Sequence, residues 1–142
     1  MVPEVTALFN EVRLLFNALV QRGESLHADG GLTMAQRAVL EYLLINGPAT
    51  VPGIARARRV TRQHVQALVN PLLEDGYVES VENPEHKRSR LIALTPAGDR
   101  LIRSMRQREM DFLAAADPGL STSQLNQATY VLRRVRGAIE GG

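Results

Sequence analysis

The side chains best suited to pairing with nucleic-acid bases lie in one short stretch, residues 61–70. Gln63, Gln66 and Asn70 recur at helical spacing, so we expect them on the outward face of one helix. An amide side chain offers a donor and an acceptor together and can form two hydrogen bonds with the edge of adenine. Arg62, near the start of this helix, can reach guanine or a phosphate. This pattern predicts contact with the bases of DNA.

Positive charge concentrates around the same stretch. From Tyr42 to Leu73 the sequence has no aspartate or glutamate, yet it contains Arg56, Arg58, Arg59 and Arg62. Such a cluster suits a polyanion, although by itself it is equally compatible with a solvated basic face. Lys87 is the only lysine among 17 basic residues. Arginine favours phosphate and base contacts, because its planar group donates several hydrogen bonds at once.

A second basic segment follows between two short strand candidates. The strands are expected over Tyr77–Val81 and Arg90–Leu94, so the polar residues between them form the tip of a hairpin. The tip and its exit carry His86, Lys87, Arg88 and Arg90 beside Glu82 and Glu85. An ordinary polar turn is the alternative. A basic hairpin directly after a helix–turn–helix instead favours insertion of an arginine into the minor groove.

Capping signals place the helices that position these groups. Thr33 with Gln36 predicts a helix start, and Asn46-Gly47-Pro48 predicts its end, with Gly47 as a left-handed cap. Thr50 caps a short helix through Ala57. Thr61 caps the base-contacting helix, which Asp75-Gly76 terminates. The buried faces are expected at Val39, Leu40, Leu43 and Leu44 in the first of these helices and at Val65, Leu68, Val69 and Leu72 in the last.

Pro71 lies well inside the base-contacting helix. It removes one backbone hydrogen bond and crowds the carbonyl of Ala67, at a cost on the order of 3 kcal/mol in a straight helix. We therefore expect a kink or an early end near Asn70. The DNA-facing part precedes this point.

Three further helices are expected outside this core, from about Val5 to Leu26, from Pro96 to about Asp117, and from Ser121 onward. Ser121 and Gln124 form another capping box. The first and last carry heptad-like apolar stripes that one chain of 142 residues cannot easily cover, which predicts a homodimer. The expected dimerisation residues are Leu8, Val12, Leu15, Leu125, Leu132 and Val135.

Length and composition exclude several classes. A chain of 142 residues predicts a single domain, mainly α with a small β-hairpin. It has no cysteine, so thiol chemistry is excluded, and no apolar run long enough to span a membrane. The N-terminus does not resemble a signal peptide, so we expect a cytoplasmic protein. His27, His64 and His86 are scattered, and we expect no enzyme activity, metal or cofactor.

The stretch from Leu32 to Ile102 resembles the multiple-antibiotic-resistance regulator (MarR) family. The matching parts are Leu32-Thr33 with Gln36, Gly47-Pro48, Ile54-Ala55, Val60-Thr61-Arg62, Asp75-Gly76-Tyr77-Val78, Arg88 and Leu94-Thr95-Pro96-Ala97-Gly98. The resemblance implies a winged helix-turn-helix over residues 32–95. It implies a helical dimerisation part over 4–28 and 96–140, and release from DNA by a small aromatic or lipophilic molecule.

Two positions depart from the family pattern. The wing usually has an aspartate two residues before its arginine, where this chain has His86. A turn position usually filled by glycine is Arg59, which must accept a positive φ or alter the turn.

We therefore predict a sequence-specific DNA-binding regulator, acting as a dimeric repressor on a pseudo-palindromic operator in double-stranded DNA. The expected DNA contacts are Thr61, Arg62, Gln63, His64, Gln66, Asn70, Arg56, Arg58, Arg59, Lys87, Arg88 and Arg90. The alternative is a winged-helix protein-interaction module, which would need a neutral or apolar outer face on the helix that Thr61 caps. A ligand pocket would lie between the first, second and fifth helices. Arg13, His27 and Arg37 are candidates there, but none is assigned as a ligand residue.

Overall fold

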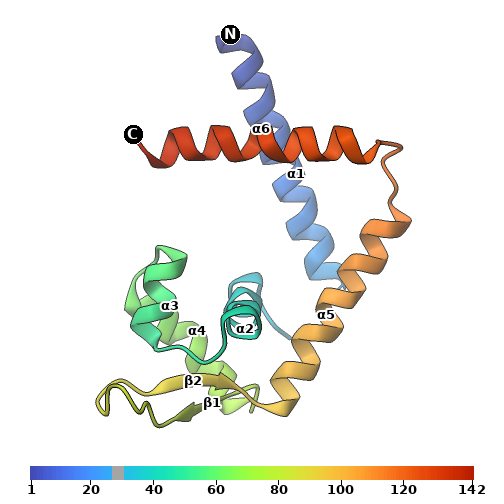
Figure 1. The fold of residues 1–142 in the computed structure, drawn as a ribbon. Coiled ribbons are helices and arrows are strands. Elements are labelled where there is room, and N and C mark those ends of the chain that lie inside the picture. Colours follow the sequence, from blue (N-terminus) through green and yellow to red (C-terminus); the bar gives the residue numbers. More distant parts are fainter. Residues whose placement is uncertain (27–30) are drawn as a thin grey trace. The chain divides into compact units, whose positions relative to one another are not determined.

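The computed structural model describes residues 1–26 and 31–142. Over these ranges the chain forms six helices and one hairpin, in the order α1 (Val2–Leu26), α2 (Met34–Asn46), α3 (Val51–Arg58), α4 (Arg62–Glu74), β1 (Val78–Val81), β2 (Leu91–Leu94), α5 (Pro96–Ala115) and α6 (Thr122–Glu140) (Figure 1). The mainly helical class with a small hairpin is confirmed. The chain divides into two units, residues 1–109 and 110–142, which are described separately.

The core of the first unit gathers residues from α2, α3, α4, the hairpin and α5. Its largest fully buried side chains include Leu40, Ile54, Leu72 and Ile102. The predicted inner faces of α2 and α4 are confirmed, because each contributes three buried residues to this core. Burial of each such side chain contributes about 1.5–3 kcal/mol. The core therefore fixes one face of α4 inward and leaves the opposite face to solvent.

Threonine side chains begin the three helices of this region as predicted. The hydroxyls of Thr33, Thr50 and Thr61 each accept the backbone N–H three residues ahead, at 3.0–3.1 Å. The capping box of Thr33 is complete, since the Gln36 side chain accepts the Thr33 N–H. Each cap contributes about 1 kcal/mol. Local sequence thus sets where α2, α3 and α4 start.

Two helix ends show how the backbone turns. Gly47 has φ 81° and ψ −173°, so its φ is positive but its conformation is not the predicted left-handed one. At Arg59 the sequence allowed either a positive φ or an altered turn. The structure shows the positive φ, because Arg59 adopts the left-handed conformation with φ 56° and ψ 44°. The backbone N–H of Arg59 donates to the carbonyls of Ala55 and Arg56 at the end of α3. A non-glycine residue there costs about 1–2 kcal/mol.

Of the two outcomes expected near Asn70, the early end is wrong, because α4 continues to Glu74, while the kink stays a prediction. Val69 and Leu72, on either side of the proline, are fully buried, so core packing holds the last turn in place. Ala67, whose carbonyl loses its helical partner, lies on the exposed side of α4. Water can bond that carbonyl, which lowers the cost of the proline.

The hairpin is bonded to the helical region at its base. β1 and β2 pair antiparallel with Val78 opposite Leu94 and Val81 opposite Leu91, within one residue of the predicted strands. Ile92 of β2 also exchanges two backbone hydrogen bonds with Ala49, in the loop before α3, at 2.7 and 3.1 Å. The hairpin is therefore joined to the segment that leads into the helix–turn–helix.

The start of α5 is packed directly against the turn that follows α4. The Thr95 hydroxyl donates to the carbonyl of Gly76 at 2.5 Å, and the Thr95 N–H donates to the carbonyl of Tyr77 at 3.1 Å. Gly98 is buried there, and a Cβ at that position would lie 1.9 Å from the Tyr77 carbonyl oxygen. Only glycine lets the backbones of α5 and of Tyr77 come this close, which explains why Gly98 follows Thr95-Pro96-Ala97.

The helices outside the core expose their apolar residues. In α1, Leu15 and Phe16 are 57% and 61% exposed, and α6 contains no buried residue. The predicted capping box of Ser121 with Gln124 is present at the start of α6. The sequence Asp29-Gly30-Gly31 predicts a break after α1, and its first two residues lie outside the described residues. In the part that the structure describes, no helix is both long enough and apolar enough to cross a membrane.

Candidate nucleic-acid interface

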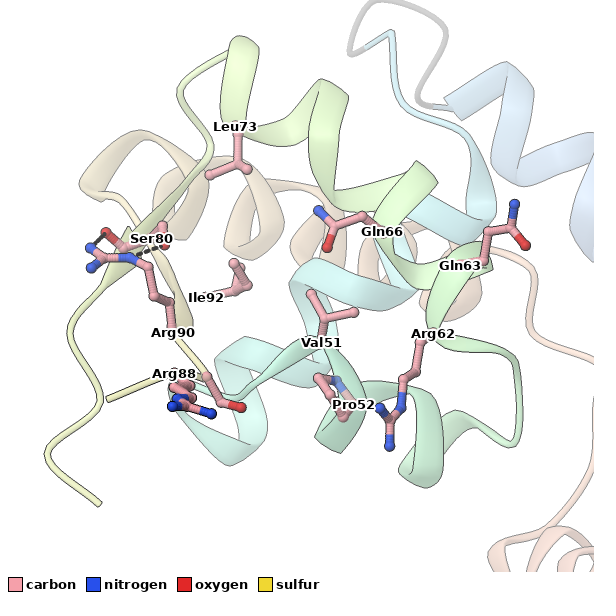
Figure 2. Close-up of a pocket in the computed structure, with 11 residues that line it drawn as sticks. Val51, Pro52, Arg62, Gln63, Gln66, Leu73, Ser80, Arg88, Arg90 and Ile92 are labelled. Atoms are coloured by element: carbon pink, nitrogen blue, oxygen red, sulfur yellow. Dashed lines mark hydrogen bonds between the residues drawn. The ribbon is translucent and has the colours of Figure 1, made fainter. Parts of the chain in front are cut away.

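An open groove of about 530 Å³ lies between α4, the first turn of α3 and the hairpin (Figure 2). Arg62, Gln63 and Gln66 belong to its α4 side, and Arg88 and Arg90 to its hairpin side. The remaining lining residues are Val51, Pro52, Leu73, Ser80, Ser89 and Ile92. The groove therefore brings together five of the predicted DNA contacts from segments far apart in the sequence.

The outward face of α4 is mostly polar, with Ala67 as an exposed apolar residue. Val65 and Val69 are buried in the core, whereas Gln63, Gln66 and Asn70 are exposed. Thr61, Arg62 and His64 are also exposed at the start of the helix. Because the buried and the exposed residues lie on opposite faces, α4 can present hydrogen-bond donors and acceptors to a partner without disturbing its packing against the core.

Two amides on this face are bonded to each other. The Nε2 of Gln66 donates to the Oδ1 of Asn70 at 2.7 Å. The two residues are four apart, so they are neighbours on the helix surface. The spacing alone could have suggested the contact, but the sequence could not select the side-chain conformers that make it.

The hairpin tip presents its basic residues on a tight turn. The Asn83 side chain is buried and its Oδ1 accepts the N–H of Glu85 at 3.1 Å, while the Ser89 N–H donates to the carbonyl of His86 at 3.1 Å. These bonds shape the backbone that carries Lys87 and Arg88, both of which are exposed. Among the described residues, none has a recorded bond to the Arg88 guanidinium, so its position follows from the turn rather than from a neighbouring carboxylate.

Arg90 is bonded across the hairpin. Its Nε donates to the Ser80 Oγ at 2.7 Å, and an Nη donates to the Ser80 carbonyl at 3.0 Å, as Figure 2 shows. Ser80 is opposite Ile92, and Arg90 lies two residues before Ile92, directly ahead of β2, so it is within diagonal reach of Ser80. Sequence reasoning assigned Arg90 to DNA and did not identify Ser80. The two bonds show that Arg90 also fixes the shape of the hairpin near its tip.

The other predicted basic contacts lie outside the groove. Arg56, Arg58 and Arg59 are exposed at the end of α3, and none of them lines the groove beside α4. Arg58 instead borders a second depression with residues of α2 such as Tyr42 and Ile45. The structure therefore separates the arginine cluster seen in the sequence into Arg62, in the groove, and a group at the end of α3.

Candidate ligand residues have different surroundings. Arg37 is 14% exposed and its guanidinium pairs with Glu109 of α5 and, at 3.7 Å, with Glu41 of α2. Arg37 therefore serves as a cation that links α2 to α5. Arg13 is exposed on α1, and His27 lies outside the described residues. Over the described ranges, no cluster of three His, Asp or Glu side chains could hold a metal ion.

The predicted dimerisation residues lie on α1 and α6. Val12 and Leu15 of α1 are exposed, as are Leu125 and Leu132 of α6, while Leu8 and Val135 are partly buried. These two helices belong to different units of the chain. Each carries large apolar side chains that the single chain leaves in solvent.

Three comparisons with known proteins each find transcription regulators. The MarR family profile matches residues 30–89. The crystal structure of the MarR family transcription regulator SP03579 aligns with a TM-score of 0.87 and 30% identity, covering 99% of this chain and 95% of that one. The transcriptional activatory protein BadR of Rhodopseudomonas palustris is 36% identical over 95 residues, which are 59% of this chain and 54% of BadR.

A third relative has the same fold at lower identity. It is BpsR of Bordetella bronchiseptica, whose structure concerns the regulation of its DNA binding by 6-hydroxynicotinic acid. It aligns with a TM-score of 0.75 and 22% identity, covering 89% of this chain and 91% of BpsR. The groove between α4 and the hairpin, the family profile and the full-length match to SP03579 agree, and this chain belongs to the MarR family of DNA-binding transcription regulators.

Proposed function

We propose that the chain is a homodimeric repressor that binds a pseudo-palindromic operator in double-stranded DNA and is released by a small molecule. The observation that carries the proposal is the groove in which the polar face of α4 and the arginines of the hairpin border one opening. An α-helix fits the major groove of B-DNA, and a basic hairpin beside it can enter the neighbouring minor groove.

The parts of the chain divide the work in this proposal. Residues 32–95 form the winged helix-turn-helix that contacts DNA, with α4 as the recognition helix and the hairpin as the wing. Residues 4–28 and 96–140 form the helical dimerisation part. Arg62 serves base and phosphate contacts at the start of α4, and Arg88 enters the minor groove from the wing.

Dimerisation is supported by the apolar surface of the outer helices. α6 buries none of its residues, and its apolar side chains Leu125 and Leu132 are 46% and 40% exposed. Large apolar side chains repeated along a helix are rarely left in water by a stable monomer. A second copy of the chain is the partner that a two-fold operator requires, because it supplies a second recognition helix on the same side of the duplex.

Repression follows from what such a dimer covers. Two recognition helices about one helical turn apart occupy DNA that a polymerase needs. BadR is named an activatory protein, so the sign of regulation depends on where the operator lies relative to the promoter. A reporter driven by the chain's own upstream region tests the sign, because repression predicts higher expression when the gene is deleted. Lower expression after deletion would support activation.

A small aromatic or lipophilic effector fits both the composition and the relatives. The chain contains no cysteine, so it cannot sense oxidants through a thiol. BpsR, which shares the fold, is regulated by an aromatic acid. We assign no residue of this chain to the effector. A protein that controls transcription acts where the chromosome lies, so we propose a cytoplasmic location.

The alternative is a winged helix that binds another protein instead of DNA. That function favours an apolar or neutral outer face on α4. Most of the exposed side chains of α4 are polar, among them Arg62, Gln63, Gln66 and Asn70. This face matches base edges and phosphates better than it matches an apolar protein surface.

Fluorescence anisotropy on a palindromic site obtained by selection tests the function. Each subunit brings seven basic groups toward DNA: Arg56, Arg58, Arg59, Arg62, Lys87, Arg88 and Arg90. If about half of these in a dimer neutralise a phosphate, the log–log salt slope is on the order of −6. Inserting about five base pairs between the half-sites rotates one by half a turn and removes most of the affinity. A flat salt dependence, or equal binding to the spaced site, contradicts a two-fold DNA-binding dimer.

A further inference from the structure

We infer that Gln66 selects an adenine in each half-site and that Asn70 positions the Gln66 amide for this selection. The inference rests on the proposed function, because it requires α4 to lie in the major groove. It starts from the hydrogen bond between Gln66 Nε2 and Asn70 Oδ1, which is 2.7 Å long. Both side chains are exposed, so this bond is not needed to satisfy buried groups.

The bond sets which end of the amide carries the nitrogen. Gln66 Nε2 has two hydrogens, and one of them is donated to Asn70. The second hydrogen and the carbonyl Oε1 remain to form an acceptor and a donor side by side. Adenine presents the complementary pair in the major groove, a donor at its N6 amino group and an acceptor at N7.

Guanine is rejected by the same arrangement. It presents O6 where adenine presents the N6 amino group, so two acceptors would face each other at Gln66 Oε1. An unconstrained glutamine can rotate its amide and donate to O6 instead. The bond to Asn70 couples this rotation to a second one, because Gln66 Oε1 would face Asn70 Oδ1 unless the Asn70 amide turned over as well. Asn70 therefore acts on specificity through Gln66.

Preorganisation separates Gln66 from Gln63. Both residues line the groove and both are exposed on α4. Among the residues that the structure describes, the Gln66 side chain is hydrogen-bonded to a neighbouring side chain on this face, and the Gln63 side chain is not. A long side chain that is already ordered loses less conformational entropy when it binds. Gln66 is therefore the better-prepared base contact of the two.

Its position along α4 also suits contact with a base. Arg62, Gln66 and Asn70 follow one another at intervals of four residues, about 6 Å along a helix axis. Successive base pairs are about 3.4 Å apart, so these side chains meet different base pairs. Gln66 is in the N-terminal half of α4, the half that recognition helices direct toward bases.

Selection from random double-stranded DNA, followed by sequencing, tests the inference with the full-length protein. The variants are Gln66→Ala, Asn70→Ala, Asn70→Asp and the neighbouring Gln63→Ala. The wild-type motif should contain one adenine per half-site whose preference over guanine is about tenfold. Gln66→Ala should lose that preference. Gln63→Ala removes a different predicted DNA contact, so it should weaken binding but keep the adenine preference at this position.

The Asn70 variants separate positioning from general binding. Asn70→Ala removes the acceptor, so the adenine-to-guanine ratio should fall severalfold. Asn70→Asp keeps an acceptor for Gln66 Nε2 but adds a negative charge near phosphates, so it should bind all sequences more weakly at a preserved ratio. A merely structural role for Asn70 would change affinity in both variants and leave the ratio untouched in both.

A single-atom change in the DNA completes the test. Replacing the selected adenine by 7-deazaadenine removes N7 and should weaken wild-type binding severalfold, while leaving the affinity of Gln66→Ala unchanged. If the wild type selects no motif, the proposed function fails. If it selects a palindrome in which no adenine depends on Gln66, or if 7-deazaadenine weakens both proteins equally, the function stands and this inference is overturned.

Discussion

The winged-helix region and α6 differ in how they use their apolar residues. In the first, Leu40, Ile54 and Leu72 are fully buried within the single chain. In α6 no residue is buried, although the helix is capped and carries a regular apolar stripe. The difference indicates that the chain itself fixes the face of α4 that we propose for DNA, whereas α6 is left to pack against the second copy that we propose. Four sets of substitutions test the two regions, beginning with the largest expected effect.

Charges in the α6 stripe should abolish DNA binding without unfolding the winged helix. Leu132→Glu with Val135→Glu places unpaired carboxylates where the proposed dimer is apolar, and each carries a large desolvation cost. We expect a monomer by light scattering and at least about a hundredfold loss of affinity, because one half-site remains. Circular dichroism should still show the helices of the winged-helix region. A wild-type chain that is a folded monomer at micromolar concentration would contradict the dimer.

A methyl group at Gly98 should damage the winged-helix region directly. Gly98→Ala places a carbon 1.9 Å from the Tyr77 carbonyl oxygen, so α5 or the turn after α4 must move. We expect a destabilisation of about 1–3 kcal/mol or more, measured by urea unfolding. Gly137→Ala is the matched control on α6, where nothing lies within 4 Å of the added carbon. It should raise stability by about 0.5–1 kcal/mol, since glycine is unfavourable inside a helix. Equal effects at both positions would refute the close approach at Gly98.

Alanine substitutions at Arg62 and at Arg88 should change DNA binding in different ways. Arg62→Ala should cost about 1–3 kcal/mol and relax the base preference at one position per half-site. Arg88→Ala should weaken binding to many sequences alike and reduce the salt slope, because the wing contacts phosphates and groove shape. Anisotropy titrations on operator and random DNA separate the two. An Arg62→Ala variant that loses equal affinity for both DNAs would contradict its base contact.

The smallest expected effect is a gain. Arg59→Gly relieves the left-handed conformation at the end of α3, where φ is 56°. Thermal unfolding should show a stabilisation of up to about 1 kcal/mol, reduced by the greater freedom of glycine in the unfolded chain. Arg59→Ala is the control, because it removes the same side chain but keeps the strained backbone. A melting temperature for Arg59→Gly no higher than that of Arg59→Ala would show that the conformation costs little.

Local signals predicted the elements well, and long-range packing decided the rest. Thr33, Thr50 and Thr61 cap helices because their bonds reach only three residues ahead. Pro71 did not end α4, because buried neighbours on both sides outweigh its local cost. Propensity arguments at a single residue do not contain that packing energy.

The candidate site was predicted by residue type but not by conformation. Gln63, Gln66 and Asn70 follow from helical periodicity, and all are exposed on α4. The bonds of Gln66 to Asn70 and of Arg90 to Ser80 depend on rotamers and on strand register, which one sequence does not specify. The backbone pairing of Ala49 with Ile92 joins segments more than forty residues apart and has no local signal.

That pairing makes the tip of the wing a replaceable part. β2 is held by Ala49, which pairs with Ile92, and the bonds of Thr95 to Gly76 and Tyr77 join the end of β2 to the start of β1, whereas Glu82 to Ser89 add only short-range bonds of their own. Mutations at the tip therefore leave the alignment of the hairpin with α4 intact. In the proposed complex, the contribution of the wing to DNA affinity can therefore change during evolution, or be redesigned by loop grafting, through this segment while the rest of the chain keeps its fold.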